Sequence, residues 1–178
     1  MRLFRRAVLA MFCLVLLLVG VGFLLPRHFS ISRSTVIQAP AERIYAELEY
    51  PKAWRSWSVW PRRDPAMKIS YSGAEHGVNA RWSWESKTEG SGSMTFTASD
   101  PGRQLVYKLE FPEFGMVSTG SLSLEPVAGG SKLSWTNEGD MGINPLSRYM
   151  GLMMDRMVGP DFEGGLSNLK QQLEKPAS

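Results

Sequence analysis

The sequence feature that most constrains this chain is an uninterrupted apolar stretch near its N-terminus. Ala7–Leu25 contains no charged residue and no proline, and it is long enough for a helix to cross about 30 Å of hydrocarbon. Arg2, Arg5 and Arg6 precede it, and basic residues favour the cytoplasmic side of a membrane span. We therefore expect a single-pass membrane protein with a cytoplasmic N-terminus.

A cleaved signal peptide is the alternative interpretation of this stretch. The apolar region of a signal peptide usually has about 7–15 residues, and a small-x-small site follows it. The stretch here is longer, and Gly20–Leu25 offers no such site. We favour an uncleaved anchor: residues 1–27 form a cytoplasmic stub and transmembrane helix, and residues 28–178 form one domain on the outer, periplasmic or extracellular, side.

Charge and cysteine content exclude several classes of protein. The chain has a formal net charge of +3, with 20 Lys and Arg against 17 Asp and Glu. The N-terminal arginines and Arg27 precede every acidic residue, so the domain itself has a slight excess of acid. That balance argues against a nucleic-acid groove, which needs clustered basic residues. Cys13 is the only cysteine and lies in the apolar stretch, so the domain has no disulfide.

The domain is expected to open with a strand followed by two short helices. Phe29–Ile37 has the loose alternation of a strand. Pro40 and Glu42 are typical of a helix start, where proline fits the first turn and an acid faces the positive end of the helix dipole. Lys52–Ser58 can add one or two further helical turns. This part of the chain therefore has the order β-α-α.

Six further strands are expected next, separated by short turns rich in Gly, Pro and Asp. Short turns favour pairing of consecutive strands, so we expect a seven-stranded antiparallel meander. Alternating apolar residues, such as Leu105, Tyr107 and Leu109, give the sheet one apolar face. The expected strands are Met67–Tyr71, Val78–Glu85, Ser91–Ser99, Gln104–Phe111, Met116–Glu125 and Lys132–Asn137.

From Pro145 to Lys175 the apolar residues fall three to five apart, which predicts one long helix. Pro160 removes a backbone donor from that helix and predicts a kink. The fold class is therefore α+β: a seven-stranded antiparallel sheet gripping a long C-terminal helix, in the order β-α-α-β6-α, preceded by one transmembrane helix.

This order, together with three local segments, resembles a known superfamily. The segments are Val36–Ala41, Trp54–Ser58 and Gly159–Leu166. They are similar to a membrane-anchored bacterial branch of the START-like superfamily (SRPBCC, helix-grip), which includes polyketide cyclase/dehydrase-type domains. The resemblance implies a cavity between sheet and helix for lipids, polyketides or other apolar molecules. The superfamily has no universal catalytic motif, so no catalytic residue is carried over.

The sequence offers little for chemistry. His28 and His76 are the only histidines, so we assign no metal site, no cofactor and no Ser-His-acid triad. Most acidic residues are expected on the surface. Asp161 is the exception that we single out, because it follows a Met-rich stripe and would act as a general acid or base if it faced an apolar cavity.

Aromatic and methionine side chains are more numerous than a small core needs for packing alone, although each could simply fill that core. Flexible Met side chains adapt to varied apolar ligands, and Trp or Tyr adds a polar contact. We therefore predict a ligand cavity lined by Trp57, Trp60, Trp82, Trp84, Phe96, Tyr107, Phe111, Trp135, Met150, Met153 and Met157.

The predicted function is a membrane-anchored module that binds a hydrophobic small molecule or lipid. An enzyme of the cyclase/dehydrase type is the first alternative, and it would need a buried acid or tyrosine pair at substrate distance. The second alternative is an envelope interaction domain with a filled core and an exposed apolar patch.

Overall fold

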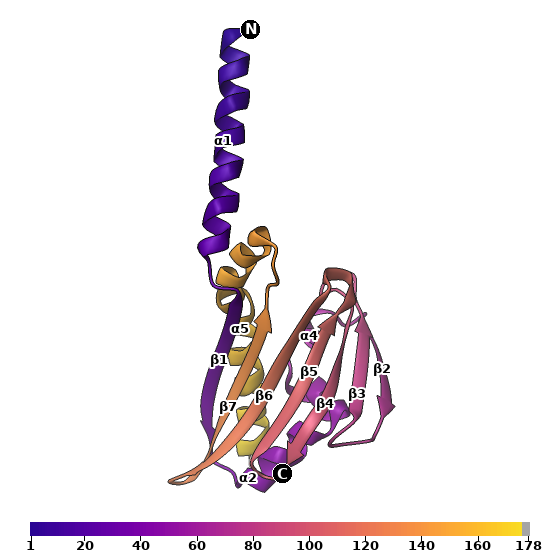
Figure 1. Cartoon of the computed structure of the whole chain (residues 1–178). Coiled ribbons are helices and arrows are strands. Elements are labelled where there is room, and N and C mark those ends of the chain that lie inside the picture. Colours follow the sequence, from indigo (N-terminus) through magenta and orange to yellow (C-terminus); the bar gives the residue numbers. More distant parts are fainter. Residues whose placement is uncertain (176–178) are drawn as a thin grey trace.

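The structure is a computed structural model, and it describes residues 1–175. Helix α1 (Arg2–Leu24) extends away from a single domain, in which one curved sheet lies against one long helix (Figure 1). The domain starts with β1 (His28–Ile37), followed by α2 (Ala41–Glu49) and three short helices: η1 (Pro51–Ala53), α3 (Trp54–Trp57) and α4 (Trp60–Arg63). The remaining elements are β2 (Lys68–Gly73), β3 (Ala80–Glu85), β4 (Gly92–Asp100), β5 (Gln104–Phe111), η2 (Pro112–Phe114), β6 (Met116–Val127), β7 (Gly130–Asp140) and α5 (Pro145–Glu174).

The seven strands form one antiparallel sheet in the order β1-β7-β6-β5-β4-β3-β2. Strands β2 to β7 pair with their neighbours in sequence, as predicted. The predicted sequential pairing is wrong for β1, which pairs with β7 along its whole length, from His28 opposite Asp140 to Ile37 opposite Ser131. The segment from α2 to α4 carries the chain between the two edges of the sheet, so β1 and β2 do not meet.

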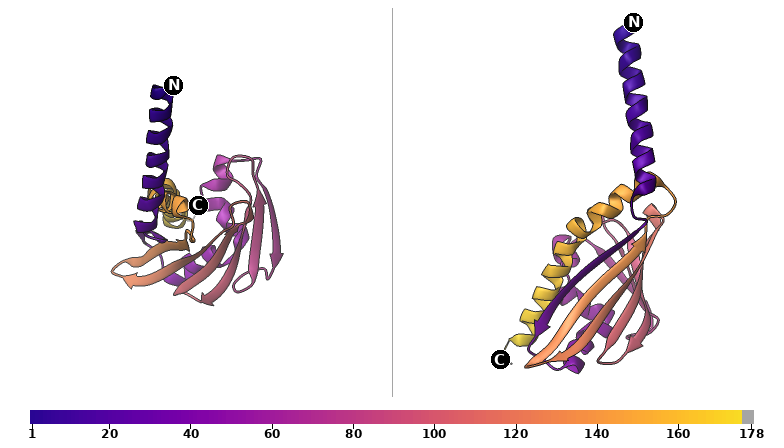
Figure 2. Two further views of the ribbon diagram at one scale, coloured as in Figure 1. Left: turned by 45° about the horizontal axis from the view of Figure 1, so that its top comes forward. Right: turned by 60° about the vertical axis from the view of Figure 1, so that its left-hand side comes forward.

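Helix α5 lies across the concave face of the sheet, as both views in Figure 2 show. Arg33 of β1 fixes it there, donating to Asp155 at 2.8 Å and to Glu163 at 2.6 Å. The predicted helix is thus confirmed, and it continues through Pro160. Its course can be followed from orange to yellow in the right-hand view of Figure 2, and the kink expected at Pro160 stays a prediction.

The space between sheet and helix differs at its two ends. We call the end where β1 begins and β7 ends the α1 end, and the end with the β6–β7 turn the far end. At the far end, helices α2 and α3 fill the space together with α5. The fully buried side chains there include Ile37, Ile44, Leu48, Trp57, Leu105, Leu122, Leu133 and Leu169.

Within residues 1–175, α1 is the one helix long and apolar enough to cross a membrane, with a mean hydropathy of 2.9 over 18 residues. A signal sequence near the N-terminus can also be this long and apolar. The described structure therefore agrees with an N-terminal membrane-associated segment, while the uncleaved anchor and its orientation stay predictions.

Candidate functional site

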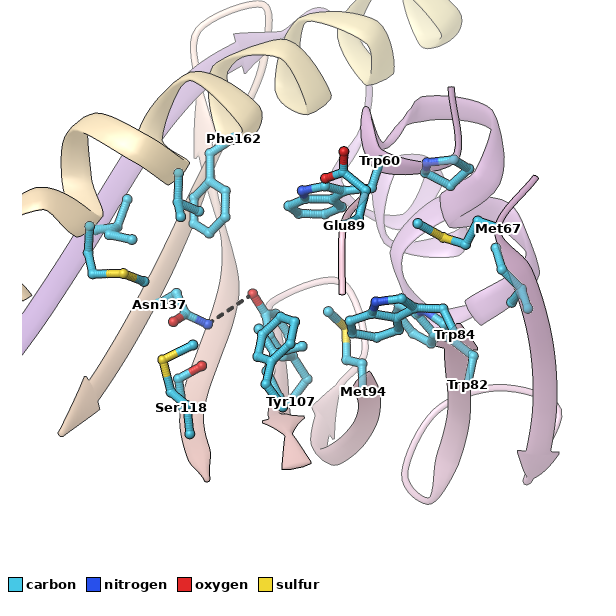
Figure 3. A pocket seen from close by; sticks show the side chains of 18 residues that line it. Trp60, Met67, Trp82, Trp84, Glu89, Met94, Tyr107, Ser118, Asn137 and Phe162 are labelled. Atoms are coloured by element: carbon cyan, nitrogen blue, oxygen red, sulfur yellow. Dashed lines mark hydrogen bonds between the residues drawn. The ribbon is translucent and has the colours of Figure 1, made fainter. Parts of the chain in front are cut away.

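A cavity of about 180 Å³ separates the sheet from α5 at the α1 end (Figure 3). It lies along the strand ends that form the α1 end of the sheet. Phe111, for example, is the last residue of β5, and Met116 is the first residue of β6. The residues that line it are Ile31, Trp60, Pro61, Met67, Ile69, Trp82, Trp84, Glu89, Met94, Tyr107, Leu109, Phe111, Met116, Ser118, Asn137, Met154, Val158 and Phe162.

A glycine on the neighbouring strand shapes one wall of the cavity. Gly92 of β4 lies opposite Trp84 of β3, and a Cβ at position 92 would lie 2.6 Å from Cζ2 of Trp84. Because Gly92 has no side chain, the indole lies across β4 and meets Phe111 of β5 edge to face, with ring centroids 5.7 Å apart. Trp84 and Phe111 therefore form one continuous aromatic wall.

The polar part of the cavity is centred on Tyr107 of β5. Its register partner is Gly120 of β6, where a Cβ would overlap the phenol ring. The ring therefore crosses β6, and its hydroxyl accepts a hydrogen bond from Trp135 Nε1 at 2.8 Å and one from Asn137 Nδ2 at 3.5 Å, both on β7. Burial raises the pKa of Tyr107 to about 12, although these two hydrogen bonds act in the opposite direction.

Tyr107 therefore keeps its proton at neutral pH and has a donor to offer. Within residues 1–175, neither Ser118 Oγ nor Asn137 Oδ1 has a hydrogen-bond partner. Ser118 and Asn137 both line the cavity beside Tyr107 (Figure 3). This cluster can bind one hydroxyl or carbonyl group at the base of an otherwise apolar cavity.

Charged side chains bridge one edge of the cavity. Arg63 of α4 pairs with Asp161 of α5 and, at 3.0 Å, with Glu89 in the β3–β4 turn. Trp60 donates its indole N–H to Asp161 Oδ2 at 3.0 Å. These contacts hold α4 against α5 and turn the Trp60 ring toward the cavity (Figure 3).

Asp161 is not placed as a general acid or base would be. Its side chain is only 13% exposed, but it does not line the cavity, and its carboxylate binds Arg63 and Trp60. The geometry gives Asp161 a positioning role for Trp60 in place of the chemical role considered from the sequence.

The eleven residues predicted to bind ligand fall into three groups. Those that line the cavity are Trp60, Trp82, Trp84, Tyr107 and Phe111. Those that lie behind its walls, in the packed core, are Trp57, Phe96 and Trp135. Trp135 supports the wall directly, because it stacks on Phe162 with ring centroids 4.0 Å apart.

The third group corrects the prediction. Met150, Met153 and Met157 lie on the exposed face of α5 and do not line the cavity; their exposed fractions are 50%, 54% and 53%. A neighbouring face of the same helix supplies Met154, Val158 and Phe162 instead. Spacing by four residues could have identified that face, had the sheet side of the helix been known.

Strand alternation could have identified some of the other lining residues. Leu109 shares a side of β5 with Tyr107 and Phe111, and Ser118 shares a side of β6 with Met116. No sequence signal points to Asn137 or Glu89. Asn137 becomes part of the site only because β1 pairs beyond β7 and leaves β7 in the interior of the sheet.

Residues 28–174 match the model of a family described as polyketide cyclase / dehydrase and lipid transport. The chain belongs to this family. The resemblance to START-like, helix-grip proteins is thereby confirmed, while the match says little about a membrane-anchored branch. No curated protein matches the chain.

Solved structures share the fold of this polyketide cyclase/dehydrase and lipid transport domain. A protein from Thermobifida fusca has a TM-score of 0.62 at 20% identity, covering 84% of this chain and 97% of its own. A protein from Chromobacterium violaceum has a TM-score of 0.57 at 19% identity, covering 83% of this chain and 98% of its own. Ara h 8.0201 has a TM-score of 0.56 at 13% identity, covering 82% and 97%. At these identities the likeness shows the fold alone.

The described residues contain no group of three or more His, Cys, Asp or Glu side chains that could hold a metal ion.

Proposed function

We propose that the domain binds a hydrophobic molecule with one polar group in the cavity at the α1 end, while α1 remains as an uncleaved anchor with its N-terminus in the cytoplasm. The observation that carries this proposal is the contrast between the two ends of the domain. The far end is packed, whereas the α1 end is hollow, apolar, and has Tyr107, Ser118 and Asn137 grouped at one place. An apolar pocket with a few convergent polar groups is typical of small-molecule sites.

The volume of the cavity restricts what enters it. An apolar cavity of about 150 Å³ holds a molecule the size of benzene, and the cavity here measures about 180 Å³. It is smaller than the roughly 300–1,000 Å³ of pockets that enclose whole drug-sized ligands. We infer that a single ring or a short acyl segment enters, with its polar group at Tyr107, and that the rest of a larger ligand lies outside.

Binding explains the arrangement better than catalysis. Cyclase or dehydrase chemistry needs a base beside the ligand. Within residues 1–175, Glu89 is the one carboxylate that lines the cavity, and it pairs with Arg63 at the edge. Tyr107 is a hydrogen-bond donor with a raised pKa, which suits recognition of a neutral polar group. The family description nevertheless keeps an enzymatic role as the alternative.

Native mass spectrometry of the domain from Arg27 onward, purified without detergent and followed by extraction, tests the proposal. The family match spans residues 28–174 and begins after α1, which supports folding of this part alone. We expect a co-purifying hydrophobic molecule with one hydroxyl or carbonyl group near its apolar end. An empty protein that gains no thermal stability from a panel of lipids and aromatic ketones would contradict the proposal.

A further inference from the structure

Helix α5 carries a second apolar face that the cavity does not use. Leu146, Met150, Met153 and Met157 follow one another at intervals of four, three and four residues, so they share one face of the helix. Each of these side chains is at least 50% exposed, and Ile143 just before the helix is 80% exposed. We call Leu146, Met150, Met153 and Met157 the α5 stripe. From Met141 to Met154 the chain contains no acidic residue.

The first turns of α5 are bound directly to α1. The Arg148 guanidinium donates to the carbonyl oxygen of Phe23 at 2.8 Å, and the Tyr149 hydroxyl donates to that of Leu18 at 2.7 Å. Gly22 allows the two helices to touch, because a Cβ there would lie 2.7 Å from the Pro145 carbonyl oxygen. The position of α5 relative to α1 is therefore set by hydrogen bonds to the last two turns of α1, and the Phe23 carbonyl is one of the terminal carbonyls that have no partner within the helix.

These contacts fix the height of α5 in a membrane. Helix α1 has 23 residues, so it is about 35 Å long, which is slightly more than the thickness of a bilayer core, about 30 Å. Leu18 lies about 9 Å before the end of α1. Because the Tyr149 side chain reaches the Leu18 carbonyl, the start of α5 is held beside the last turns of the span, where the hydrocarbon gives way to the lipid head groups. Tyrosine favours this layer.

We propose that the α5 stripe is a membrane-contact surface, immersed in the interfacial layer of the leaflet on the domain's side. The occupant is lipid because the stripe begins beside α1, whose apolar side chains are exposed along nearly the whole helix. The inference requires that α1 spans a bilayer.

This surface has a consequence for the cavity, which rests on the proposed function. Met154 lines the cavity next to Met153 of the stripe, and the cavity lies at the α1 end. A lipid segment can therefore pass between bilayer and cavity over a short distance, while the rest of that lipid stays in the leaflet.

Site-specific fluorescence on the full chain in phosphatidylcholine nanodiscs tests the surface. In a Cys13→Ser background, single cysteines replace Met150, Met153 or Val127 and carry an environment-sensitive fluorophore. Val127 is the matched control, because it is 38% exposed but lies at the β6–β7 turn of the far end. We expect labels at 150 and 153 to be quenched several-fold more by bromine-labelled acyl chains than the label at 127, and to resist iodide.

Iodide quenching at 150 and 153 equal to that at 127 would overturn the inference. Protection from iodide without quenching by brominated lipid would also overturn it, because a protein would then cover the stripe. If the labels contact lipid but the protein binds no ligand, the membrane-contact surface is supported and the proposed function is contradicted. The two failures are therefore distinguishable. Unchanged circular dichroism confirms that each labelled chain is folded.

Discussion

Tyr107 reaches β7 because the residue opposite it on β6 is Gly120. A side chain at position 120 would occupy the space of the phenol ring. The ring would then leave the two donors on β7, Trp135 Nε1 and Asn137 Nδ2, without their acceptor. A single glycine thus determines where the polar group of the cavity lies.

Gly120→Ala is therefore expected to destabilise the domain by about 1–3 kcal/mol, the usual cost of overpacking a core. The measurement is the free energy of unfolding in urea. Thr119→Ala, one residue earlier on the exposed face of β6, is the control and should change stability little. Equal stability of the two variants would mean that Tyr107 does not lie over Gly120.

Tyr107 also predicts a pH dependence. Burial raises its pKa from 10.0 in the unfolded chain to about 12 in the folded domain. Between these two pH values the unfolded chain has lost the proton and the folded domain still holds it, so stability falls as pH rises. At about 1.4 kcal/mol per pH unit, the loss amounts to roughly 2–3 kcal/mol.

Tyr107→Phe isolates this effect. The variant loses stability at neutral pH, because two buried donors lose their acceptor, but it lacks the titration between pH 10 and 12. We expect the difference in unfolding free energy between wild type and variant to shrink over that range. A difference that stays constant would show that the hydroxyl is solvated and does not face a dry cavity.

At the scale of elements, the sequence predicts the type and order of nearly all of them, because strands alternate with period two and α5 has helical spacing. It does not predict which side of α5 meets the sheet. That helix has apolar residues on two faces in its first half, so spacing alone placed Met150, Met153 and Met157 in the cavity. Met154 and Val158 occupy that position instead.

The sequence also could not separate the hollow end of the sheet from the filled one. Both ends of each strand have the same apolar alternation, and the difference arises from α2 and α3, which pack against the far end only. Trp57 and Trp135 therefore look like Trp60 and Trp84 in the sequence, although the first pair is fully buried in the core.

Helix α4 is expected to be the movable part of the cavity wall, because it has only four residues and Arg63 alone joins it to the rest of the domain by ion pairs. Arg63→Gln removes the pairs with Asp161 and Glu89. We predict faster deuterium uptake in residues 59–67 and around Glu89, with little change in melting temperature, since the Arg63 side chain is 49% exposed. Lys87→Gln, in the same turn as Glu89, is the control. Unchanged uptake in Arg63→Gln would mean that packing of Trp60 alone holds α4.

At the scale of the whole molecule, we predict that the domain lies on the outer side of the membrane. Arg2, Arg5 and Arg6 precede α1, and positively charged flanks stay in the cytoplasm. Alkaline phosphatase fused after Ser178 should be active in a bacterial host, and a green fluorescent protein fused there should be dark. The opposite pattern would contradict this orientation while leaving the cavity unaffected.

The most direct test of the central claim, that the cavity holds a hydrophobic ligand, is the bound fraction of ligand in two neighbouring tryptophan variants. Val158→Trp fills the cavity, whereas Met157→Trp adds the same side chain on the exposed face of α5. Native mass spectrometry of the domain from Arg27 onward should show ligand bound to the wild type and to Met157→Trp, and at least ten-fold less bound to Val158→Trp. Equal occupancy in both variants would contradict the account, because the ligand would then bind elsewhere.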